Sequence, residues 1–137
     1  MFDVYGNERL ICWKDFRNKL EDSPAALEEC VRWWSKAPFV SPYLDPQDSK
    51  SWPDPWRLIL DSKFDNLAIV LGIMYTLQLT VRFKHDEFKI YMKHDDQDMP
   101  YILSVGDQCV IDLYNLEIEN QHRFSVSDYR LIFASKN

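Results

Sequence analysis

The chain changes its hydrophobic pattern near residue 85. Before that point apolar residues recur at helical spacing or fill a continuous run, whereas after it they alternate with polar residues. A period near 3.6 is typical of helices, and a period of two is typical of strands. The sequence therefore predicts a helical first half followed by a strand-rich second half.

Two helices are predicted in the first thirty-odd residues. Residues 8–20 show apolar side chains among charges, at Ile11, Trp13, Phe16 and Leu20. A second helix is predicted over residues 24–34, with Asp22 or Ser23 as its cap and Pro24 at the first helical position. Its apolar face consists of Leu27, Cys30, Val31 and Trp34.

The segment from Pro38 to Pro55 holds five of the seven prolines and is called the strap below. Each proline fixes its own φ and drives the preceding residue toward extended geometry, which excludes a regular helix or a central strand. A free linker would not carry the apolar residues that interrupt it, Phe39, Val40, Tyr43, Leu44 and Trp52. We therefore expect an ordered extended segment that lies across the domain or against a partner.

Two further helices follow the strap. Asp54 and Pro55 predict the cap and the first position of a short helix over residues 56–64. Residues 65–83 are apolar on every side at their centre, which indicates a helix surrounded by its own protein. A buried strand would give a similar run, but the length, and Asp61 and Ser62 as caps, favour a helix.

The second half predicts an antiparallel sheet. Residues 87–93 alternate, and the short runs 101–105 and 109–115 flank a hairpin signal at Gly106–Asp107. Residues 123–127 and 129–134 suggest one or two more strands. The predicted fold is a single α+β domain over residues 1–137, with N-terminal helices and the strap, then a buried helix packed on three to five antiparallel strands.

Charge narrows the classes of partner. The chain has a net charge of −6, whereas nucleic-acid binding and binding to anionic membranes both need a basic face. The apolar run Leu67–Tyr75 is about half of the ~20 residues that a membrane span needs, and the start MFDVYGNERL does not resemble a secretory signal. We expect a soluble cytosolic chain that binds neither nucleic acid nor membrane.

No motif predicts a catalytic, metal or cofactor site. The acidic run His94–Asp98 lacks the glycine and the terminal glutamate of a calcium loop, so a solvated turn is the expectation. The histidines, His85, His94 and His122, lack the paired spacing of zinc ligands. The cysteines, Cys12, Cys30 and Cys109, are an odd set at wide spacing, so we expect reduced, buried thiols. Phosphate-binding and nucleophile motifs are absent, and no cofactor is expected.

Aromatic residues are unusually frequent, at 15% with five tryptophans. Such rings fill cores, and they also anchor neighbouring chains at interfaces. The interface candidates are Trp33, Trp34, Phe39, Tyr43, Trp52 and Trp56. Because Trp33 and Trp34 are adjacent, they point about 100° apart on a helix. At least one of them is therefore expected at a margin or a contact.

A family resemblance rests on two motifs in this aromatic region. The first is a Trp-Ser-x-x-Pro segment at Trp34–Pro38, and the second is Ser-Trp-Pro-x-Pro-Trp at Ser51–Trp56, followed by the long apolar helix. Over residues 10–85 the chain resembles small proteins encoded by contractile-tailed, marine myovirus-type bacteriophages. The resemblance implies synthesis in a host cytoplasm, a place in the virion, and other phage structural proteins as partners in a symmetric assembly.

The order of elements also resembles the core of the transglutaminase-like fold. In that family the buried helix begins with a nucleophilic cysteine, and two strands bring a histidine and an aspartate to it. Here Ser62–Asn66 contains no cysteine, Tyr101 stands where the histidine would be, and Asp112 alone is at a fitting place. The resemblance therefore implies a pseudoenzyme that serves as a scaffold.

The expected function is a non-enzymatic structural component of a phage particle, such as a neck, tail or baseplate subunit that acts through protein–protein contacts. One alternative is a small hydrolase or transferase of transglutaminase-like fold, with a non-standard site at Asp65, Tyr101 and Asp112. Another is a phage interaction protein that is not part of the virion.

Overall fold

The computed structural model describes residues 2–61, 63–93, 101–112, 117–120 and 129–135, with the backbone alone for 93, 109–112 and 117–120. The helices in this part are α1 (Gly6–Leu20), α2 (Ala26–Trp34), α3 (Pro55–Ile59) and α4 (Asn66–Gln78), with a 3-10 turn at Ser49–Ser51. The strands are β1 (Phe88–Lys93), β2 (Tyr101–Val105), β3 (Gln108–Asp112), β4 (Glu117–Asn120) and β5 (Tyr129–Ser135). The predicted α+β class is confirmed.

The described strands form one antiparallel sheet in the order β4-β3-β2-β1-β5. Gly106, with φ of 59°, turns the chain between β2 and β3 where the hairpin was predicted. β4 was not predicted, because its sequence EIEN has a single apolar residue. The strand expected at residues 123–127 lies outside the described residues.

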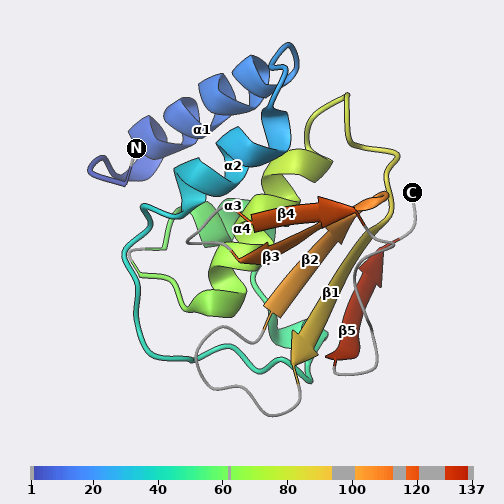
Figure 1. The fold of residues 1–137 in the computed structure, drawn as a ribbon. Coiled ribbons are helices and arrows are strands. Elements are labelled where there is room, and N and C mark those ends of the chain that lie inside the picture. The colour runs from blue at the N-terminus through green and yellow to red at the C-terminus, as the bar shows by residue number, and fades with distance from the viewer. Residues whose placement is uncertain (1, 62, 94–100, 113–116, 121–128, 136–137) are drawn as a thin grey trace.

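The helices cover one face of the sheet in layers (Figure 1). α4 lies against the sheet, α2 packs on α4, and α1 contacts α2 and α3. Phe88 and Ile90 of β1 are fully buried on the helix-facing side, and Met92 is partly buried against the same core. The alternation predicted for this strand is therefore confirmed, and the main core lies between the sheet and the helices.

α4 is buried along most of its length, as its unbroken apolar run predicted. Its cap differs from the prediction. The cap is Asp65, whose Oδ1 accepts a hydrogen bond from the Ala68 backbone N–H at 2.7 Å. The assignment of Asp61 and Ser62 as caps is wrong, because the helix begins only at Asn66.

The late start of α4 has a tertiary cause. Phe64 is extended and forms a parallel bridge with Phe39 of the strap. The Phe64 N–H donates to the Pro38 carbonyl at 2.8 Å, and the Val40 N–H donates to the Phe64 carbonyl at 3.0 Å. The strap thus fixes the chain immediately before α4.

The caps of the shorter helices agree with the sequence in one case out of two. Asp54 caps α3 by accepting a hydrogen bond from the Arg57 N–H at 2.8 Å, as predicted, although α3 ends at Ile59. α2 begins at Ala26 and not at Pro24. The predicted cap is wrong there, because the Ser23 hydroxyl accepts from the Ala25 N–H at 3.1 Å and closes a separate turn first.

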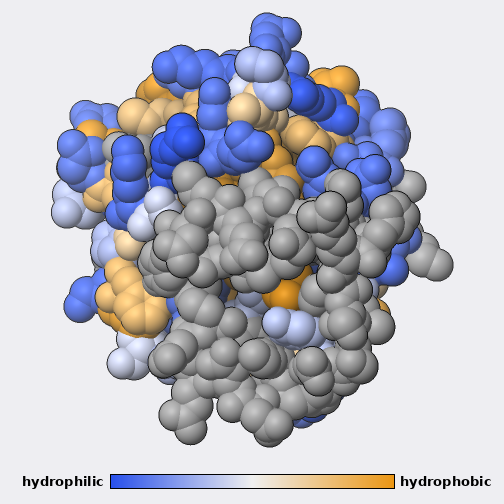
Figure 2. Space-filling view, viewed as in Figure 1, coloured by the Kyte–Doolittle hydropathy of each residue, from blue (hydrophilic) through white to orange (hydrophobic). Residues whose placement is uncertain are grey.

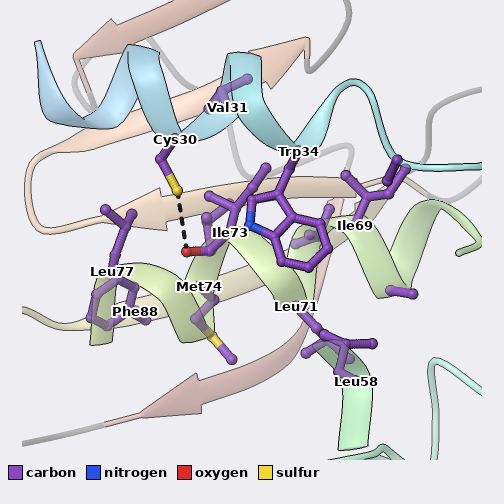
Figure 3. Close-up of a cluster of buried hydrophobic side chains, with 14 of the residues drawn as sticks. Cys30, Val31, Trp34, Leu58, Ile69, Leu71, Ile73, Met74, Leu77 and Phe88 are labelled. Atoms are coloured by element: carbon purple, nitrogen blue, oxygen red, sulfur yellow. Dashed lines mark hydrogen bonds between the residues drawn. The ribbon is translucent and has the colours of Figure 1, made fainter. Parts of the chain in front are cut away.

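The contact between α2 and α4 is unusually close. A Cβ on Gly72 would lie within 3.0 Å of the Trp34 ring, so α4 accepts the indole only because residue 72 is glycine. Figure 3 shows Trp34 lying over α4, with Cys30 beside it. The Cys30 thiol donates to the Ile73 carbonyl at 3.8 Å. α2 is therefore held on α4 by its apolar face, and Trp34 is central to that contact.

Candidate functional site

A groove of about 560 Å³ lies between α1 and α2. Its lining from α1 is Cys12, Asp15, Phe16 and Lys19, and its lining from α2 and the residues just after it is Glu29, Arg32, Trp33 and Lys36. These α2 positions follow the spacing i, i+3, i+4 and i+7, which marks one face of a helix. The opposite face of α2 packs into the core, so this α1–α2 groove opens outward.

The floor of the α1–α2 groove is a stacked aromatic pair. The rings of Phe16 and Trp33 are parallel within 3°, and their centroids lie 4.5 Å apart. Trp33 also contacts Phe2 at 5.3 Å and Trp34 at 5.5 Å, between ring centroids. Ring pairs of this kind contribute about 0.5–1.5 kcal/mol beyond their buried area. The partly exposed Trp33 is therefore held in one orientation.

The two adjacent tryptophans have different roles. Trp33 is partly exposed in the groove, which agrees with the expectation that at least one of the pair lies at a margin. Trp34 has an exposed fraction of 0%. Its assignment as an interface candidate is wrong, because its ring fills the space above Gly72 and its indole N–H donates to Thr76 inside the core.

The rim of the groove carries charges of both signs. Asp15, Lys19, Arg32 and Lys36 are exposed, and Glu29 is partly exposed. In the part of the chain that the structure describes, none of these five side chains has an ion-pair partner. The rim therefore offers two acids and three bases that are free to interact with a partner.

The remaining interface candidates lie on the strap and on α3. Phe39, Tyr43 and Trp56 have exposed fractions of 54%, 51% and 49%. Figure 2 shows hydrophobic surface at the left edge of the view, where Figure 1 places the strap. Trp52 is partly buried against Phe133 of β5, with ring centroids 5.8 Å apart. Of the strap and α3 candidates, Trp52 is thus the one that contributes mainly to the fold.

The strap is fixed to the head of α4 by Asp65. The carboxylate is 1% exposed, and its Oδ2 accepts the backbone N–H groups of Tyr43 at 2.8 Å and Leu44 at 2.9 Å. Its other oxygen caps α4. A hydroxyl bond from Tyr75 to the Pro53 carbonyl, at 2.8 Å, holds the far end of the strap. The predicted order of the strap is confirmed.

Of the three residues of the alternative enzymatic site, the structure describes the side chains of Asp65 and Tyr101. Tyr101 is 8% exposed on β2, and no hydrogen bond joins it to Asp65 among the described residues. Burial first, and then the carboxylates of Asp65 and Asp45, raise the pKa of Tyr101 to about 12. Such a phenol stays protonated at neutral pH. The side chain of Asp112 lies outside the described residues.

The thiols divide by exposure. Cys12 is partly exposed in the α1–α2 groove, whereas Cys30 is buried, and both are free. Burial raises the pKa of the Cys30 thiol well above its ordinary range, so Cys30 stays protonated as a core residue. The expectation of a buried, reduced thiol is confirmed for Cys30. Cys12 is also reduced, but the expectation that it is buried is wrong. The side chain of Cys109 lies outside the described residues.

The described residues contain no group of three His, Cys, Asp or Glu side chains that could hold a metal ion. His85 is exposed, while the acidic run His94–Asp98 and His122 lie outside the described residues. Within the same described ranges, no helix is both long enough and apolar enough to cross a bilayer.

Comparison with protein-family models, curated proteins and solved structures finds no significant match. The site is therefore interpreted from its own geometry. It combines a stacked pair of partly exposed aromatic rings with charged side chains of both signs around them.

Sequence reasoning found Trp33 but missed the groove around it. The sequence pattern places Phe16 on a helix but does not place it beside the charges of α2. The spacing of Glu29, Arg32, Trp33 and Lys36 was a usable signal, because it sets a tryptophan on a charged outer face. The position of Phe16 beside that face had no sequence signal, since it depends on how α1 packs on α2.

Proposed function

We propose that this protein is a non-enzymatic structural component of a bacteriophage particle, in the neck, tail or baseplate, that binds its neighbours through exposed aromatic side chains. The observation that carries the binding role is the half-exposed set Phe39, Tyr43 and Trp56. The phage assignment rests on the resemblance of the motifs at Trp34–Pro38 and Ser51–Trp56. Aromatic residues held in place lose little conformational entropy on binding, and for that reason they dominate interface energetics.

The hydrogen bonds of the Asp65 carboxylate support a structural role. Asp65 lies at the head of the buried helix, the place where enzymes of the transglutaminase-like fold carry their nucleophile. Its two oxygens accept three backbone N–H groups, from Tyr43, Leu44 and Ala68. A carboxylate committed in this way holds the fold together and has little capacity left to act as a base.

The direct test is mass spectrometry of gradient-purified particles. We expect the chain at a fixed ratio to the other virion proteins. A phage that encodes Phe39→Ser with Tyr43→Ser should incorporate several-fold less of it. Val81→Ser is the matched control, because Val81 is 69% exposed on the turn after α4, away from the strap. Recovery of the wild-type chain from infected cytosol, and never from particles, would contradict the proposal.

Turnover assays separate the proposal from the enzymatic alternative. We expect the purified chain to leave ester, amide and peptide substrates unchanged. Turnover that is lost in Tyr101→Phe would establish the hydrolase or transferase reading instead. Binding to host proteins by a chain that is absent from particles would establish an interaction protein outside the virion.

A further inference from the structure

The rim of the α1–α2 groove carries both acidic and basic side chains. These are two acids and three bases, a net charge of +1, while the whole chain carries −6. Two copies of an acidic chain repel each other less where patches of mixed charge meet than where acidic surfaces meet. A partner with a single sign of charge would leave two or three of these five groups facing like charge.

The order of the charges along the two helices adds a geometric argument. α1 and α2 run in roughly opposite directions (Figure 1). Lys19 and Glu29 therefore lie near the turn that joins the helices, and Asp15 and Lys36 lie near the other end of the groove. Each end of the groove thus has an acid on one helix and a base on the other.

We infer that the α1–α2 groove binds the same groove of a second copy of this chain, in a dimer with two-fold symmetry. A two-fold axis parallel to the helices sets α1 of one copy over α2 of the other. Lys19 then meets Glu29 of the second copy, and Asp15 meets Lys36, and each contact occurs twice. An interface of this symmetry needs both signs in one patch, since every residue contacts its complement on an identical surface.

The stacked pair supplies the apolar centre of this interface. Phe16 and Trp33 lie on the floor between the two sets of charges, and both are partly exposed. A central aromatic cluster inside a polar rim is the usual arrangement at protein interfaces. The dimer goes beyond the proposed function, because it forms in solution without any other component of a particle.

The test is sedimentation of the purified full chain over a range of concentrations up to about 1 mM, where even weak interfaces associate. We expect a species of twice the 16.4 kDa chain mass. Lys36→Glu alone and Asp15→Lys alone should each weaken the dimer about tenfold, because two contacts change from attraction to repulsion. Salt at about 1 M, where the Debye length is about 3 Å, should shrink both effects.

Charge exchange makes the test specific for this pairing. The double variant Asp15→Lys with Lys36→Glu should recover the wild-type dissociation constant, and so should an equal mixture of the two single variants. Lys50→Glu is the matched control, because Lys50 is exposed on the strap outside the groove, and it should leave the dimer unchanged. Thermal unfolding confirms that each variant is folded.

Three results would overturn the inference. They are a wild-type chain that stays monomeric throughout, a dimer that both single reversals leave intact, and a double variant that fails to recover association. The outcome is separable from the proposed function. A dimer whose chain is absent from particles defeats the virion proposal alone, and a monomer found in particles defeats the dimer alone.

Discussion

At the scale of single residues, the hydroxyl of Thr76 links three helices, α1, α2 and α4. It accepts hydrogen bonds from the indole N–H of Trp13 on α1, at 2.9 Å, and of Trp34 on α2, at 3.0 Å. It donates its own proton to the Gly72 carbonyl at 2.6 Å. Two large side chains can therefore be buried with their polar atoms satisfied.

Replacing Thr76 with valine should be costly. The variant keeps the shape of the side chain but leaves two buried indole donors without an acceptor, so we expect the free energy of unfolding to fall by about 2–5 kcal/mol. Urea denaturation followed by tryptophan fluorescence measures it. Thr76→Ser keeps the hydroxyl and loses one methyl group, and should lose only about 1 kcal/mol. Equal losses in the two variants would contradict the role given to the hydroxyl.

The sequence predicts the directions of Trp33 and Trp34 but not which of the two is buried. Their directions on the helix could be predicted, and with them the expectation that one would lie at a margin. Which one enters the core could not, because both are equally large and apolar. Trp34 is selected by a hollow over Gly72, and that hollow exists only when α2 packs on α4.

At the scale of elements, the strap and α4 form a single unit joined at Asp65. The order of the strap could be predicted from its prolines and aromatic residues. The start of α4 could not, because it is set by the bridge between Phe39 and Phe64, which leaves no local pattern. β4 was missed for a related reason. Its pairing with β3 defines it as a strand, while its own residues are mostly polar.

Asp65→Asn should loosen this unit. The amide nitrogen of asparagine would face backbone N–H donors that now meet a carboxylate oxygen, and hydrogen bonds to a charged group are worth about 1.5–3 kcal/mol each. We expect a loss of about 2–4 kcal/mol in urea denaturation, with faster hydrogen exchange at the amides of Tyr43 and Leu44.

The control for this prediction is Asp54→Asn. Asp54 is an exposed cap of α3 with one such bond, and asparagine caps a helix about as well as aspartate, so little change is expected. If the Tyr43 and Leu44 amides exchange no faster in Asp65→Asn than in Asp54→Asn, the strap is not held by this carboxylate.

At the scale of the whole molecule, the fold class could be predicted because the hydrophobic period changes once, from helical to alternating. The α1–α2 groove could not, since it requires the outer faces of two helices to lie side by side.

The stability of the whole fold should also depend on alkaline pH. Burial is the leading cause that raises the pKa of both Tyr101 and Tyr43 from 10.0 to about 12.

The free energy of unfolding should fall as the pH rises, because the folded chain holds the phenol proton of Tyr101 more tightly than the unfolded chain does. The folded pKa of Tyr101 is above the unfolded value, so its contribution is fully present below pH 10.0 and is lost as the pH rises toward about 12. The contribution is at most about 3 kcal/mol. We expect Tyr101→Phe to flatten the fall in unfolding free energy over this range, measured by urea denaturation at several pH values.

Tyr43→Phe is the comparison for the alkaline experiment. Its side chain is 51% exposed, so solvent screens much of the effect and the flattening should be smaller. A wild-type curve that falls no more steeply than that of Tyr101→Phe above pH 10.0 would show that the buried phenol is not responsible.

The contact between Gly72 and Trp34 also restricts how this protein can diverge. A side chain larger than hydrogen at position 72 collides with the indole, and a smaller ring at position 34 leaves a void over the glycine. We expect either change alone to destabilise the fold and a compensating pair to restore the fit. The two positions should therefore be inherited as a unit, so that in descendants of a common ancestor a bulkier residue at one accompanies a slimmer residue at the other.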